Sequence, residues 1–147
     1  MNYKQYLGKE YPSFTVEVEK GRLRFFADAV GEEDALYREE SAAQDSGYKS
    51  LPVSLTFPFT ITMDAGQSFN VLEDMSIPTE KAIHGEQGFV YHKPICAGDV
   101  ISGTQKVLDI YEKKGGALLF IVTETSLTNQ RKESVCDLQS TIVIRNG

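Results

Sequence analysis

The chain of 147 residues lacks the features of several large protein classes. It contains no tryptophan and only two cysteines, Cys96 and Cys136, which form no CxxC pair and are expected to be buried, reduced thiols. No stretch approaches the ~20 apolar residues that span a bilayer, and the first residues lack the apolar core of a signal peptide. Lys and Arg number 15 against 21 Asp and Glu, a net charge of −6, whereas phosphate contacts need clustered basic residues. We therefore expect a soluble, cytoplasmic protein of one domain over residues 1–147 that binds neither nucleic acid nor membrane.

The first third of the chain changes its periodicity at residue 20. Apolar and polar residues alternate strictly over 13–19, which predicts a half-buried strand. Over 20–30 the apolar residues Leu23, Phe26 and Val30 fall at helical spacing, as do Phe25 and Ala29, which predicts a short helix with one buried face. Gly31 is well placed to end that helix. The acidic stretch 31–50 is expected to be a surface connection with one or two helical turns.

The second half predicts an antiparallel sheet. Four strands are expected over 82–92, 101–111, 117–127 and 135–145, arranged as a meander, with a glycine-containing hairpin loop over 112–116. A sheet with one apolar face needs a cover. Segment 51–66 alternates like a strand, but Pro58 would remove a hydrogen-bond donor from a central strand, and no other segment is apolar enough to cover the sheet. We interpret Phe57 to Met63 as a buried helix, which gives an α+β layer structure.

Several motifs that could carry chemistry are incomplete. His84-Gly85-Glu86 and Pro94-Ile95-Cys96 resemble the zinc-deaminase pattern H-x-E…P-C-x-x-C, but position 99 is Asp, so we expect no metal site. Ser54 lacks the flanking glycines of a nucleophile elbow and is more simply a serine at a helix start. Because no glycine-rich phosphate loop is present either, no cofactor is expected.

Three stretches in order resemble the MaoC-like hydratase/dehydratase family, in particular its N-terminal, type I fatty-acid-synthase-like half. They are FFADAVGEEDALY (25–37), GY…LPVSLTFPFT (47–60) and HGEQGFVYHKPICAGDVI (84–101), and the third is the most specific. The resemblance implies a hot-dog fold, in which a curved antiparallel sheet wraps round a central helix and two such units pair side by side.

The resemblance also implies an activity. Such enzymes add water reversibly to an enoyl thioester of coenzyme A or acyl carrier protein, giving the (3R)-hydroxyacyl form. The active half carries Asp-x-x-x-x-His in a G-D-x-N-P-x-H motif, and a backbone N–H at the start of the central helix polarises the thioester carbonyl.

In this sequence the two catalytic positions of that motif are substituted. Glu32 stands at the aspartate position and Tyr37 at the histidine position. Tyrosine has a pKa of about 10 and is a poor proton acceptor at neutral pH, and the longer glutamate misplaces the carboxylate. We therefore expect the supporting half of a two-chain dehydratase, which shapes the acyl tunnel while a MaoC-like partner supplies the Asp-x-x-x-x-His dyad. The expected substrate-binding positions are Pro52, Val53, Ser54, Leu55 and Phe57.

Other hypotheses remain open at this point. Glu32 or His84 could serve as a relocated base in an active homodimer, although His84 is more simply an interface residue. A single catalytic carboxylate is the pattern of hot-dog thioesterases. A non-enzymatic module that binds acyl thioesters would need only the tunnel and the backbone donors.

Overall fold

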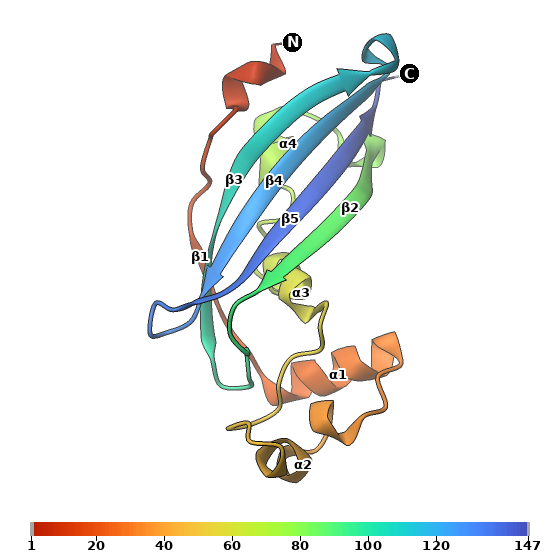
Figure 1. The fold of residues 1–147 in the computed structure, drawn as a ribbon. Helices are drawn as coiled ribbons and strands as arrows, with labels where there is room; N and C mark the ends of the chain where they lie inside the picture. The colour runs from red at the N-terminus through yellow and green to blue at the C-terminus, as the bar shows by residue number, and fades with distance from the viewer. Residues whose placement is uncertain (1, 147) are drawn as a thin grey trace.

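A computed structural model describes residues 2–146, which form one five-stranded antiparallel sheet covered by helices (Figure 1). The strands are β1 (Phe14–Glu17), β2 (Ala82–Tyr91), β3 (Val100–Lys113), β4 (Leu118–Thr128) and β5 (Ser134–Arg145). The α-helices are α1 (Lys20–Val30), α2 (Glu40–Asp45), α3 (Phe57–Asp64) and α4 (Asn70–Asp74), and four 3-10 turns lie at Tyr3–Tyr6, Ala35–Tyr37, Thr79–Lys81 and Lys114–Gly116. In Figure 1, α3 and α4 lie behind the sheet, and α1 and α2 lie below its lower end. The predicted α+β class is confirmed.

Helix α1 has the predicted bounds, although it buries a narrower face than its spacing predicted. Gly31 ends it in the left-handed conformation at φ 73°, which glycine adopts without steric cost. Leu23 and Ala27 are buried, whereas Phe25 and Val30 are 64% and 52% exposed. The prediction that Phe25 and Val30 belong to the buried face is therefore wrong, because only the stripe of Leu23, Phe26 and Ala27 packs on the core.

The predicted meander of four strands is also wrong. The strand order is β1-β3-β4-β5-β2, so only β3, β4 and β5 are a meander, and β2 pairs with β5. The edge of β3 is occupied by β1, where Phe14 pairs with Gly103. A Cβ at Gly103 would lie 2.3 Å from Cζ of Phe14, so the missing side chain makes room for the ring. This pairing leaves β2 at the opposite edge of the sheet.

Two helices cover different parts of the same sheet face. Phe57 and Ile61 of α3 belong to one core cluster, which also contains residues of α1, β3, β4 and β5. Leu72 of α4 belongs to a second cluster, toward the other end of the long strands. The prediction that 57–63 is a buried helix against the sheet is confirmed, whereas α4 was not predicted. Within residues 2–146, every helix is too short or too polar to cross a bilayer.

Candidate functional site

Two cavities adjoin α3. The first, which we name the helix-start cavity, lies at the N-terminal end of α3 and has a volume of about 270 Å³. The second, the helix–sheet cavity, lies between α3, α4 and the sheet and has a volume of about 250 Å³. The residues predicted as functional divide between these two cavities, the core and the turn after α1.

The helix-start cavity gathers four of the predicted positions. Tyr37, Pro52, Val53 and Leu55 all line it. They come from separate segments of the chain. The Val53 N–H donates to the carbonyl oxygen of Ile95 at 2.9 Å, and this bond fixes residues 51–53 against the connection between β2 and β3. The structure therefore brings together residues that are 18 positions apart in the chain.

Four predicted residues lie outside this cavity lining: Ser54, Phe57, Glu32 and His84. Ser54 and Phe57 are buried, and the Phe57 ring meets Phe26 edge to face at 5.3 Å between centroids. Glu32 lies in the turn after α1, where its Oε1 accepts a hydrogen bond from the Asp34 N–H at 3.1 Å. Phe57 thus braces α3 from the core, and the Glu32 carboxylate stabilises a turn.

The Tyr37 side chain is held in its protonated form. Burial raises its pKa above the usual value, and the negative charge of Glu32 raises it further, with smaller contributions from Tyr48 and Asp34. A protonated phenol can donate a hydrogen bond but cannot take a proton from water. Tyr37 therefore does not supply a general base at neutral pH.

The first turn of α3 offers few donors to a ligand. The Phe57 N–H donates to the Ser54 carbonyl at 2.9 Å, Pro58 has no N–H, and the Phe59 N–H donates to the Thr56 carbonyl at 3.2 Å. The first three helical residues thus present no free N–H to a thioester carbonyl. The interpretation of Ser54 as the helix-capping residue is wrong, because the N-cap is Thr56 and Ser54 contributes only its carbonyl.

Sequence reasoning missed a histidine–carboxylate pair beside this cavity. His92 lines the cavity, and its Nε2 lies 2.7 Å from Oδ2 of Asp137 on β5. Tyr91, also in the lining, donates its hydroxyl hydrogen bond to the Leu55 carbonyl. The two residues are 45 positions apart in the sequence and meet only because β2 pairs with β5. No local motif therefore indicated the contact.

His84 belongs to the other cavity. It lines the helix–sheet cavity, with its ring centroid 5.0 Å from that of Phe59. Its Nε2 lies 3.1 Å from Oε1 of Gln87, and that same oxygen accepts a hydrogen bond from Oγ of Ser140 at 2.5 Å. His84 and Tyr37 therefore line different cavities.

Neither cysteine has the properties of a nucleophile. Both are free and buried, as predicted. Burial, reinforced by Asp137, raises the pKa of the Cys136 thiol to about 11, and burial with a contribution from Asp99 raises that of Cys96. Both thiols are protonated at neutral pH. No three His, Cys, Asp or Glu side chains within residues 2–146 group closely enough to hold a metal ion.

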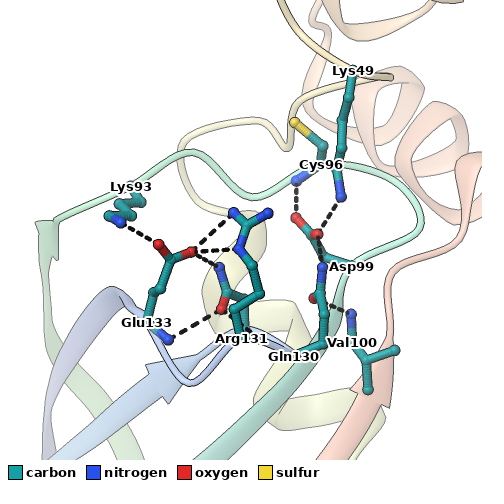
Figure 2. A network of polar contacts seen from close by, with 9 residues as sticks. Lys49, Lys93, Cys96, Asp99, Val100, Gln130, Arg131 and Glu133 are labelled. Carbon is teal, nitrogen blue, oxygen red and sulfur yellow. Dashed lines mark hydrogen bonds and ion pairs between the residues drawn. The ribbon is translucent and has the colours of Figure 1, made fainter.

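A buried aspartate holds the wall of the helix-start cavity in place (Figure 2). Asp99 accepts hydrogen bonds from Lys49, from the Cys96 N–H at 2.8 Å and from Nε2 of Gln130 at 2.9 Å. Burial alone would raise the pKa of this carboxyl, but the three donors outweigh that effect and the pKa lies below its usual value. The network ties the connection between β2 and β3 to the turn that precedes β5.

That turn has an ionic anchor of its own. Glu133 accepts hydrogen bonds from Asn129 at 2.8 Å and Arg131 at 2.9 Å, and it forms an ion pair with Lys93. These contacts lower the pKa of Glu133 from its ordinary 4.5 to about 2. Figure 2 shows this group beside that of Asp99.

The Glu133 contacts predict a specific acid sensitivity. Because the folded carboxyl has the lower pKa, its contribution to stability is complete above pH 4.5 and is lost as the pH falls toward 2. Glu133→Gln should therefore unfold with a weaker pH dependence than the parent over this interval, as measured by urea denaturation at a series of pH values. Parallel pH profiles of parent and variant would contradict this assignment.

Comparisons with known proteins agree with this architecture. The family described as the FAS1-like, dehydratase domain region matches residues 5–138. A UPF0336 protein from Saccharopolyspora erythraea is 30% identical over 141 residues, which are 95% of this chain and 89% of that protein.

Solved structures share the same fold. The truncated HadBC complex of Mycobacterium tuberculosis, described as a 3R-hydroxyacyl-ACP dehydratase, has a chain with a TM-score of 0.81 and 26% identity, covering 94% of this chain and 96% of that one. A structure described as a MaoC-like dehydratase has a TM-score of 0.86 and 24% identity, and the match covers 97% of this chain and 43% of that one. At this identity the match shows only that the fold is shared. The resemblance and the hot-dog fold predicted from the sequence are confirmed: the chain belongs to the FAS1-like dehydratase-region family.

Proposed function

We propose that this chain is the supporting subunit of a two-chain (3R)-hydroxyacyl-thioester dehydratase, whose partner carries the Asp-x-x-x-x-His dyad. The substrate is an acyl thioester of coenzyme A or acyl carrier protein. The observation that carries the proposal is Tyr37, a protonated phenol at the position where the active half has its base.

The chemistry explains why the partner is needed. Dehydration removes a proton from Cα and transfers one to the departing 3-hydroxyl, while the thioester carbonyl gains negative charge. Tyr37 does not accept the proton, and the first three residues of α3 have no free N–H for the carbonyl oxygen. Both functions fall to the second chain in this proposal.

The partner surface that we propose is the free edge of β2. Within residues 2–146 this edge has no neighbouring strand, and Ile83, Val90 and Tyr91 of β2 are 40%, 57% and 50% exposed. An apolar strand edge left open invites pairing with another chain. A second hot-dog unit on this edge would cover His84 and Tyr91, which are among the β2 residues that line the two cavities. A partner chain is supported by the relative in the HadBC complex, which is described as a 3R-hydroxyacyl-ACP dehydratase.

The test compares this chain alone with a mixture containing a MaoC-like chain that carries the Asp-x-x-x-x-His motif. Crotonyl-CoA hydration, followed as loss of enoyl-thioester absorbance, should appear only with the partner. Turnover by this chain alone would overturn the proposal in favour of an active homodimer. Release of free thiol from acyl-CoA would indicate a thioesterase, and ligand binding with no turnover in either sample would indicate a binding module.

A further inference from the structure

A row of polar side chains crosses the floor of the helix–sheet cavity. Gln105 on β3 pairs directly with Thr125 on β4, and Thr123 on β4 pairs with Ser140 on β5. Alternation along β4 places Thr123 and Thr125 on the same face. We name Gln105, Thr123, Thr125 and Ser140 the polar belt, and all four line the cavity.

The polar belt interrupts an apolar core. It lies between the cluster under α3 and the cluster under α4, and along β4 its two threonines stand between the buried residues Ile121 and Leu127. Thr123 is 1% exposed and Thr125 is 5% exposed. A purely structural core would place apolar side chains here, because a buried polar group destabilises the fold unless it is hydrogen-bonded.

One polar atom of this belt is unsatisfied. Gln105 Oε1 is buried and has no hydrogen-bond partner in the part of the chain that the structure describes. Buried carboxamide oxygens nearly always accept a hydrogen bond, so an unsatisfied one needs an explanation, such as a bound water or ligand. Gln105 also lines the cavity of about 250 Å³, so its carboxamide borders the space that a ligand would occupy.

The cavity also has an apolar entrance. Met63, Phe69 and Ile83 line it while remaining 43%, 46% and 40% exposed, so they form the rim between the cavity and solvent. A ligand entering here first meets apolar side chains and then the polar belt. This order suits an aliphatic acyl chain whose polar group lies far from the thioester.

We propose that the helix–sheet cavity selects acyl chains bearing a hydroxyl group beyond C3, whose O–H donates to Gln105 Oε1 and whose oxygen accepts from a belt threonine. The inference rests on the proposed function and names its substrate class. A volume of about 250 Å³ lies just below the ~300–1,000 Å³ of pockets for drug-sized ligands, so the acyl chain is short or medium in length. Plain alkyl chains of the same length leave Gln105 unsatisfied and bind more weakly.

The test measures binding rather than turnover. Hexanoyl-, octanoyl- and decanoyl-CoA are compared with their ω-hydroxy counterparts by calorimetry, on this chain alone and on the two-chain complex. None of these saturated thioesters has a 3-hydroxyl or a double bond, so no dehydration or hydration accompanies binding. At the length that brings the hydroxyl to the belt, the hydroxylated thioester should bind roughly 5- to 100-fold tighter than the alkyl one, the range expected for satisfying a buried acceptor.

Two variants and a matched control locate the effect. Gln105→Leu should abolish or reverse the preference for the hydroxylated thioester. Thr125→Val replaces the hydroxyl by a methyl group of similar volume and should reduce the preference. Gln139→Leu makes the same chemical change at an exposed position of β5 outside the cavity and should keep the parent's preference. An alkyl thioester that binds as tightly at every length, a preference that survives Gln105→Leu, or no binding at all would overturn the inference. A failure of the proposed function would instead be seen in the hydration assay.

Discussion

Tyr37→Phe and Glu32→Gln in this chain should leave kcat of the assembled dehydratase within about threefold of the parent, whereas replacing the histidine of the partner's Asp-x-x-x-x-His by alanine should lower kcat by ~10²–10⁴. The difference follows from the protonation states. Tyr37 is a protonated phenol with a raised pKa, and the Glu32 carboxylate accepts the Asp34 N–H. Tyr37 is therefore no proton acceptor, and Glu32 stabilises a turn and lies outside the lining of the helix-start cavity.

The measurement is enoyl-thioester hydration by the purified two-chain complex, with its assembly checked by size-exclusion chromatography for every variant. Because Tyr37→Phe removes only the hydroxyl, the ring still lines the helix-start cavity, and a packing defect is avoided. A loss of 100-fold or more with Tyr37→Phe in an intact complex would show that proton transfer passes through this chain. The proposal of a supporting subunit would then fail.

The sequence predicted the individual helices and strands better than it predicted which strands pair. Local periodicity placed α1 at its observed bounds and the four long strands within about two residues of theirs. Strand neighbours are a long-range property, however, and the connection between β2 and β3 did not reveal that β2 pairs with β5. In the structure β1 occupies the edge of β3, where Phe14 packs over Gly103, and β2 pairs with β5 at the opposite edge.

The same distinction applies to the candidate site. Tyr37, Pro52 and Val53 lie in stretches that carry the family resemblance, and they do share one cavity. Gln105 and Thr125 were missed because each merely interrupts the apolar face of its own strand. Their common position became visible only with the register that pairs them across β3 and β4.

Ile61→Ala should lower the free energy of unfolding by about 2–5 kcal/mol, the range for truncating a fully buried aliphatic side chain. Ile61 is 0% exposed and belongs to the core cluster that joins α3 to the sheet. Removing three of its carbons leaves a void that α3 fills poorly, because Phe57 on the same helix is held against Phe26. Urea denaturation at one fixed protein concentration measures the change, since association would add to the stability.

Met63→Ala is the matched control for this truncation. Met63 lies on the same helix, two residues further along, but it is 43% exposed at the rim of the helix–sheet cavity. The Met63 side chain therefore buries less apolar surface on folding, and Met63→Ala should lower the free energy of unfolding by well under half as much as Ile61→Ala. Equal losses for the two variants would mean that α3 is not anchored through Ile61. Because the N-terminal end of α3 borders the helix-start cavity and the next turn borders the helix–sheet cavity, both proposed binding regions depend on that anchor.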